Sequence, residues 1–327
     1  MFVPLSFAAA LAMTIASTIC WGSFANTFKL TRNYRFELYY WDYALGTVLI
    51  SVVLAFTMGS ANGGETAFTA NLRSAAASNL WYSAIGGFIF NIANVLLLAG
   101  IEIAGLAVAF PISIGIALVE GVVLSYALQP KGSAGLLAAG VAFAVLAVIL
   151  IGKAYGELKA GTTSVSRKGV IICVISGLLM GAFAPFVTKA MTTDRPLTPY
   201  AVAVLFTSGA LVCCFFFNPI LMRKPLVGTP IGFAGYRAAP GIYHALGLLG
   251  GAIWGIGTVF NFVAASLVGV AISYAIGQAS PMIAALWGVA VWHEFRGAST
   301  RAKAYLVGMF ASYTLALVLI AGAYKAG

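Results

Sequence analysis

The chain alternates long apolar stretches with short polar ones from end to end. Ten apolar runs can be delimited, at 5–28, 40–58, 79–99, 105–127, 134–152, 169–189, 199–221, 242–264, 268–291 and 304–323. A helix that crosses a bilayer needs about 20 predominantly apolar residues, and each run is close to that length. The pattern therefore predicts an all-α membrane protein of ten transmembrane helices joined by short loops.

The composition supports a membrane protein and argues against a soluble fold. Hydrophobic residues make up 61% of the 327 residues and charged residues only 8%, whereas soluble domains carry about 25% charged residues. Residues 1–6 contain no Lys or Arg, and the first run is longer than the core of a secretory leader. We therefore expect the first run to be retained as a helix.

Basic residues are divided unequally between the two sets of loops. The loops after the odd-numbered runs hold thirteen of them: Lys29, Arg32, Arg35, Lys153, Lys159, Arg167, Lys168, Arg223, Lys224, Arg237, Arg296, Arg301 and Lys303. The opposite side holds Arg73, Lys131, Lys189, Arg195 and Lys325. Because Lys and Arg concentrate in cytoplasmic loops, both termini are predicted to lie outside the cytoplasm of an inner (plasma) membrane. The net charge of +10 then indicates orientation and attraction to membrane lipid, and not binding to nucleic acid.

An internal repeat predicts how the ten helices are organised. Residues 85–115 align with residues 249–279 at a constant offset, and the alignment pairs glycines with glycines at 86 and 250, 87 and 251, and 105 and 269. Five helices per repeat, an odd number, make the second copy enter the membrane from the other side. The sequence predicts two inverted-topology repeats, 1–153 and 169–327, joined by a cytoplasmic linker at 154–168. Such halves are typical of alternating-access transporters.

Several short segments resemble known transporters. Residues 109–115, AFPISIG, resemble the Pro-Ile-Ser segment of bacterial glucose/ribose uptake permeases, and so do residues 254–257 followed by 264–271. Residues 40–43 with 55–59, and 287–288 with 294–296, resemble plant ureide permeases. The resemblance spans essentially the whole chain, which is identified as a member of the drug/metabolite transporter superfamily, in the branch that also holds rhamnose/proton symporters.

The resemblance implies a secondary active transporter and not an enzyme. Relatives in this branch import small neutral solutes rich in hydroxyl or amide groups, commonly with a coupled proton. The chain lacks the long central hydrophilic loop of plant ureide permeases, so a sugar is ranked first as the solute. A ureide or nucleobase-like compound is the alternative, and export of lipophilic cations or metabolites is another. A sodium ion instead of the proton, and assembly as a homodimer, are left open.

Polar side chains inside the apolar runs are the candidates for solute binding. A solute that loses its hydration needs hydrogen bonds and stacking surfaces from the protein. Asn91 and Asn94 share one face of the third run and offer both donors and acceptors. Trp254, Thr258 and Asn261 share a face of the eighth run, which places an aromatic plate beside two polar groups. Alternatively, the amides bind neighbouring helices and the tryptophan is a packing residue.

Prolines mark a second group of candidates. Tyr274, Gln278 and Pro281 share one face of the ninth run, and Ser280 lies on a neighbouring face. Pro281, and Pro111 in the fourth run, each remove an intrahelical hydrogen bond. Backbone groups freed at membrane depth are tolerated where protein or water satisfies them, so both prolines indicate a cavity. A helix kink without a binding site is the alternative.

The first and fourth runs complete the predicted site. Trp21 and Asn26 lie on the first run, where a lining role and a gating role are both open, and Ser113 lies in the segment that resembles the uptake permeases. Glu120 follows seven residues after Ser113 and is the candidate for proton coupling, because a carboxylate in a low-dielectric site readily holds a proton. Its alternative position is near the outer headgroups.

The remaining acids and metal-binding residue types predict no cofactor. Asp42 begins the second helix beside Arg32 and Arg35, and we expect it to pair with them at the membrane surface. His244 has no second metal-ligand type near it in the sequence, and the four cysteines lie inside apolar runs without metal-ligand spacing. We therefore expect neither a metal site nor any other cofactor.

Overall fold

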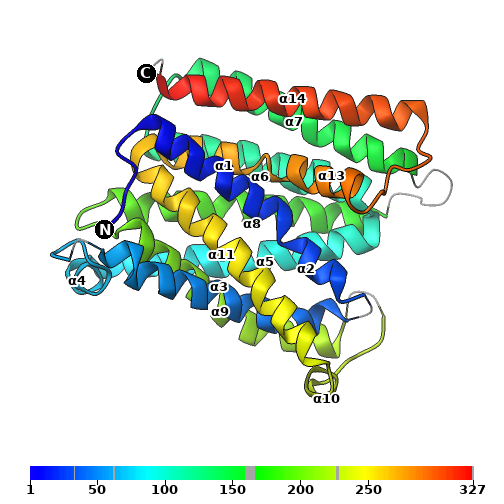
Figure 1. The fold of residues 1–327 in the computed structure, drawn as a ribbon, viewed down its shortest axis with the longest axis horizontal. Coiled ribbons are helices and arrows are strands. Elements are labelled where there is room, and N and C mark those ends of the chain that lie inside the picture. Colours follow the sequence, from blue (N-terminus) through cyan, green and yellow to red (C-terminus); the bar gives the residue numbers. More distant parts are fainter. Residues whose placement is uncertain (33, 62, 159–165, 226–227, 326–327) are drawn as a thin grey trace.

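The computed structural model describes residues 1–32, 34–61, 63–158, 166–225 and 228–325. The regular structure of these residues is helical (Figure 1), in the order α1 (Phe7–Ser23), α2 (Ala25–Leu30), α3 (Phe36–Phe56), η1 (Met58–Ser60), α4 (Phe68–Ser74), α5 (Ala77–Ala104), α6 (Leu106–Leu128), α7 (Ala134–Leu158), α8 (Arg167–Thr192), α9 (Pro199–Arg223), α10 (Phe233–Arg237), α11 (Gly241–Val268), α12 (Val270–Gly277), α13 (Ser280–Ala290) and α14 (Thr300–Lys325). Ten segments are long and apolar enough to cross a membrane. The predicted all-α fold with ten spans is confirmed.

Two spans are broken into shorter helices, which the sequence did not predict at these positions. The first span is α1 followed by α2, with Phe24 between them, and the ninth is α12 followed by α13, with Gln278 and Ala279 between them. The short helices α4 and α10 lie in loops. Helix α7 continues to Leu158, so the first part of the predicted linker is helical, and residues 159–165 lie outside the described part of the chain.

Both chain termini lie at the same end of the molecule, as an even number of spans requires (Figure 1). We call this the terminal end. The loops with the thirteen basic residues lie at the opposite end, which we call the basic end, except that Lys159 is outside the described residues. The charge asymmetry thus separates the two ends, and the assignment of the basic end to the cytoplasm stays a prediction.

Glycines bring α5 and α9 into backbone contact. A Cβ atom on Gly87 of α5 would overlap the carbonyl oxygen of Phe206 on α9, and a Cβ atom on Gly209 of α9 would overlap the carbonyl oxygen of Ala84 on α5. Close approach of this kind lets membrane helices gain van der Waals contact, which lipid cannot provide between them. The two helices are therefore held at a distance that only glycine allows.

The same contact recurs between α3 and α11. Gly251 of α11 lies against the carbonyl of Tyr43 on α3, and Gly46 of α3 lies against the carbonyl of Leu248 on α11. Each of these residues is 163 or 164 positions from its counterpart in the α5–α9 contact. The glycines of the predicted sequence repeat thus occupy matching helix contacts.

A second correspondence lies at the turns that follow α5 and α11. Gly105 separates α5 from α6 with φ 79° and ψ 159°, and Gly269 separates α11 from α12 with φ 86° and ψ 153°. Residues with a Cβ atom rarely adopt this backbone conformation, so glycine is required at both turns. Paired glycines in the sequence therefore mark paired turns in the fold.

Candidate functional site

A cavity of about 330 Å³, which we call the main cavity, lies between the spans. Its walls come from both sequence halves and include both broken spans: Trp21, Gly22, Phe24, Ala25, Phe90, Asn94, Leu97, Leu98, Ile101, Ile114, Met180, Phe183, Phe206, Trp254, Thr258, Phe262, Gln278, Ser280, Pro281 and Ala284. Small-molecule sites are concave, mostly apolar and begin at about 300 Å³. The cavity is large enough for a small solute.

Aromatic rings form much of the cavity wall. Trp254 of α11 is only 7% exposed and stacks on Phe90 of α5 and Trp21 of α1, with ring centroids 5.0 and 6.1 Å apart. Phe183 and Phe206 each contact Phe90, at 5.4 and 5.5 Å. Rings packed at these distances hold one another in place, so the cavity presents fixed aromatic faces.

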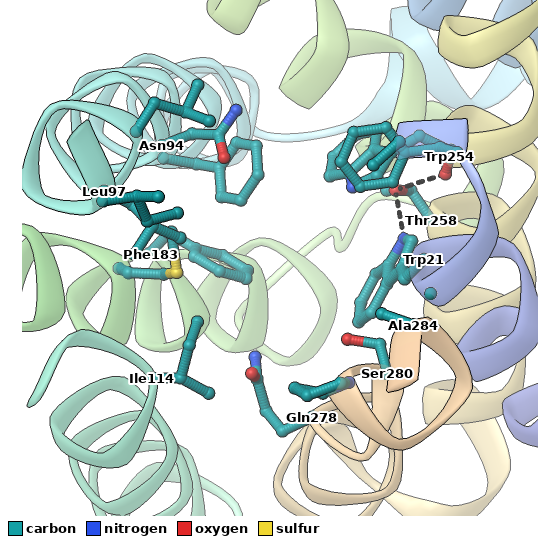
Figure 2. A pocket seen from close by; sticks show the side chains of 18 of the residues that line it. Trp21, Asn94, Leu97, Ile114, Phe183, Trp254, Thr258, Gln278, Ser280 and Ala284 are labelled. Atoms are coloured by element: carbon teal, nitrogen blue, oxygen red, sulfur yellow. Dashed lines mark hydrogen bonds between the residues drawn. The ribbon is translucent and has the colours of Figure 1, made fainter. Parts of the chain in front are cut away.

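Polar groups are few and face the cavity from different helices (Figure 2). The indole Nε1 of Trp21 donates to the hydroxyl of Thr258 at 3.2 Å, and that hydroxyl donates to the carbonyl of Trp254 at 3.1 Å. Figure 2 shows Asn94 across the cavity from this group, and Gln278 pointing inward between the two walls. The cavity therefore combines stacking surfaces with amide and hydroxyl groups.

The break in the ninth span supplies part of this polar lining. Gln278 lies in the break, and Ser280 begins α13 directly after it. Pro281 lies in the first turn of α13, where its missing N–H leaves no intrahelical bond unmade. The carbonyl of Ile276 accepts a hydrogen bond from Thr18 of α1, at 3.1 Å. The predicted disturbance at Pro281 is thus a full break, and the backbone beside the break contacts α1 through the carbonyl of Ile276.

A smaller cavity of about 190 Å³ adjoins the first one towards the basic end, and the two share lining residues of α1, α2 and α13. Its wall includes a cluster in which Glu294 binds Lys29 of α2 and accepts from the hydroxyl of Tyr155 of α7 at 3.0 Å. The Lys29 ammonium lies over the ring of Trp292, 4.3 Å from its centroid. Polar contacts between the two sequence halves thus line the smaller cavity.

Six of the eleven predicted solute-binding residues line the main cavity, namely Trp21, Asn94, Trp254, Thr258, Gln278 and Ser280. Four others bind neighbouring helices. Asn91 accepts from the hydroxyl of Tyr40 at 2.5 Å, Ser113 donates to the carbonyl of Cys173 at 2.9 Å, Asn261 donates to the carbonyl of Ser273 at 2.9 Å, and the hydroxyl of Tyr274 donates to the carbonyl of Ala117 at 3.1 Å. These contacts match the alternative in which polar groups join helices, and their role in binding stays a prediction.

Asn26 and Glu120 also lie outside the main cavity. Asn26 lines the smaller cavity and accepts from the indole of Trp292 at 2.6 Å. Glu120 lies between α6 and α8, where its side chain packs against Gly181. Its buried Oε2 atom has no hydrogen-bond partner among the described residues. The predicted coupling acid is thus within the helix bundle but does not line the candidate solute site.

The expected pairing of Asp42 with Arg32 and Arg35 is wrong. Asp42 instead binds the Nδ1 atom of His244 at 2.8 Å, and Arg35 binds Glu37 and the carbonyl of Thr229. Arg35 precedes the first turn of α3 as its N-cap, whereas Asp42 lies one to two turns into the helix and contacts Gly247 of α11. Sequence proximity therefore misled this assignment.

Sequence reasoning missed most of the aromatic lining, including Phe90, Phe183 and Phe206. Phenylalanine is common in membrane spans, and this chain has 22 of them, so composition gave no signal. The spacing of the residues did give a signal, because Phe90 lies four residues before Asn94 and shares its helix face. The site could have been enlarged from the polar candidates outward.

Comparison with known proteins places the chain among transporters. A family model described as "Ureide permease" matches residues 158–323. Ureide permease 4 of Arabidopsis thaliana is 23% identical, over 98% of this chain and 98% of its own length, and ureide permease 1 of the same plant is 22% identical, over 86% and 87%. A protein of known crystal structure shares the fold with a TM-score of 0.65, over 96% of this chain and 98% of its own, at 16% identity.

The fold, the cavity and these similarities define an integral membrane transporter of small polar solutes. The chain belongs to the ureide permease family. The ranking of sugar above ureide is not supported, because the matching family and the relatives above are ureide permeases. Membership of the wider drug/metabolite transporter superfamily stays a prediction.

Proposed function

We propose that this protein is a permease for a small neutral ureide, which binds in the main cavity. The observation that carries the proposal is the pairing of stacked aromatic rings with amide and hydroxyl groups in one cavity of about 330 Å³. A ureide is a flat acylated urea with N–H donors and carbonyl acceptors. Its faces suit Trp254 and Phe90, and its edges suit the side chains of Asn94, Gln278 and Ser280.

We propose alternating access between inverted halves as the mechanism. The matched glycine contacts of α5–α9 and α3–α11 support it, since they relate the two halves at equivalent positions. The broken spans support it as well, because discontinuous helices commonly form transporter sites near the bilayer centre. In this state the smaller cavity lies on the basic-end side of the main cavity, and exchange of the two halves' conformations would give the site access from the terminal end.

Export of lipophilic cations has less support. That alternative needs an acidic side chain facing an aromatic cavity, and no Asp or Glu is among the described residues that line the main cavity. Glu120, which could have served, packs against Gly181 of α8 instead. A neutral solute fits the uncharged lining better.

A thermal-shift screen of the purified protein tests the substrate class. We expect the cyclic ureides allantoin and hydantoin to raise the melting temperature, since a ligand at 100 times its Kd stabilises the folded state by about 2.7 kcal/mol. Glucose and ribose serve as the competing class and are expected to leave it unchanged. Stabilisation by the sugars alone would reinstate the sugar interpretation and contradict the proposal.

A further inference from the structure

A buried acid and a histidine join α3 to α11 near the basic end. Asp42 of α3 is only 4% exposed, and its carboxylate binds His244 Nδ1 at 2.8 Å and accepts from the hydroxyl of Tyr236 on α10 at 2.5 Å. The side chain of His244 is 25% exposed. The pair thus combines a shielded carboxylate with a ring that solvent can reach.

The charge of this pair depends on one proton. A carboxylate taken out of water needs a cation or a proton to offset the loss of hydration. Among the ion pairs of the described residues, His244 is the one basic partner of Asp42. With a bound proton the pair is neutral overall, and without it the pair carries one buried negative charge. Proton shuttling is a common role of histidine in proteins.

The other titratable groups that face the pair are tyrosines. Burial and the charge of Asp42 raise the pKa of Tyr34 to about 12, and burial and the bond to Asp42 raise the pKa of Tyr236. Tyr39, one turn before Asp42 on α3, donates to or accepts from Thr27 at 2.6 Å. Tyr34 and Tyr236 stay protonated at neutral pH, and of these two only Tyr236 donates a hydrogen bond to the Asp42 carboxylate.

The hydroxyl of Tyr34 is buried beside the pair and has no hydrogen-bond partner among the described residues. The Tyr34 ring meets the His244 ring edge to face, with centroids 6.4 Å apart. A spare donor next to a titrating group can bind it in one protonation state and release it in the other. The surroundings are therefore suited to two states of the pair.

We propose that Asp42 and His244 form the proton-binding site that couples a pH gradient to transport. The inference rests on the proposed transport function and assigns a proton site to it. Proton binding removes the buried charge and so favours the conformational change that closes the pair to the basic end and opens it to the terminal end. Loss of the proton restores the charge and favours the return. One proton is taken up at one face and released at the other in each cycle.

The pair is linked to the candidate solute site by direct contacts. Tyr43, the residue after Asp42, contacts Trp254 of the cavity wall, with ring centroids 6.3 Å apart. Tyr39 binds Thr27 of α2, the helix that lines the smaller cavity. A Cβ atom on Gly247 of α11 would collide with the side chain of Asp42, so α11 packs directly on Asp42. A change of charge at the pair thus acts on helices that line both cavities.

Transport of radiolabelled allantoin into proteoliposomes tests the proposal with two readouts. Counterflow measures exchange without a proton gradient, and accumulation under a pH gradient measures coupling. We expect wild-type protein to accumulate allantoin about tenfold for one pH unit, the limit for one proton. Asp42→Asn and His244→Gln are expected to keep counterflow and lose accumulation. Asp194→Asn, at a carboxylate that is 96% exposed, is the matched control and keeps both.

The possible failures are distinguishable. Absence of counterflow in the wild-type protein contradicts the proposed transport of allantoin itself. Accumulation that survives Asp42→Asn, or that only Glu120→Gln abolishes, overturns the assignment to Asp42 and His244. If both pair variants fail to fold, Tyr236→Phe decides the question. It removes a bond that favours the charged carboxylate, so the midpoint of the uptake pH profile must move to higher pH, and an unchanged midpoint overturns the proposal.

Discussion

Trp254→Ala is expected to weaken ureide binding while leaving a protein that still inserts in the membrane. Trp254 stacks on both Phe90 and Trp21, and its carbonyl holds the hydroxyl of Thr258. Its removal deletes the central stacking surface and frees its neighbours. A stacked aromatic contact is worth about 0.5–1.5 kcal/mol beyond the area it buries, so loss of the contact between Trp254 and the ureide weakens binding by up to about tenfold.

The same substitution lowers stability, so two further variants separate binding from folding. Truncation of a buried Trp to Ala costs about 3–5 kcal/mol, which the melting temperature of the purified protein reports. Trp254→Phe keeps an aromatic face and is expected to retain part of the affinity for allantoin. Trp81→Ala is the matched control, because Trp81 is 68% exposed. Undiminished allantoin binding by folded Trp254→Ala would show that the main cavity is not the binding site.

The ten spans could be predicted because each is a local property of the sequence. About 20 apolar residues in a row suffice to specify a membrane helix, and every span begins and ends within six residues of its predicted bounds. The breaks were harder to place. Pro281 indicated a disturbance in the ninth span, but the break at Gln278 also depends on packing against Trp21, which contacts the position of Gly277.

The candidate site could be predicted only in part, because a polar residue in a span has two uses. Asn94 and Asn261 look alike in the sequence, yet one lines the cavity and the other ties α11 to the backbone of Ser273. Which use applies depends on the neighbouring helix. The pair of Asp42 and His244 is a stronger example, since the two residues lie 202 positions apart and meet only through the packing of α3 on α11.

The substrate ranking failed for a related reason. The missing central loop favours a sugar at the level of sequence, although a loop outside the membrane does not line the candidate cavity. The cavity lining itself, with Asn94, Gln278 and stacked rings, fits a flat amide-rich solute at least as well as a sugar. Loop length is therefore a weaker guide to the substrate than the side chains that the solute touches.

Gly87→Ala and Gly251→Ala are expected to destabilise the protein strongly and to a similar extent. A Cβ atom at either position would overlap a backbone carbonyl of the facing helix, that of Phe206 or that of Tyr43. Backbone cannot move aside as a side chain can, so α5 must separate from α9, or α11 from α3. Overpacking in a core costs about 1–3 kcal/mol, and loss of a whole helix contact adds to that cost.

Gly322→Ala on α14 is the matched control, because no described atom outside the helix backbone lies within 4 Å of the added methyl group. Alanine in a helix is favoured over glycine by about 0.5–1 kcal/mol, so this variant should melt at or slightly above the wild-type temperature. The difference in melting temperature between this control and the other two variants then reports the loss of the helix contact, separately from the effect of alanine on helix propensity. Equal decreases in melting temperature for Gly87→Ala and Gly251→Ala would support equivalent roles for the two contacts in inverted halves. A lower melting temperature in only one of the two variants would mean that the α5–α9 and α3–α11 contacts do not contribute equally to stability, and it would contradict their equivalence.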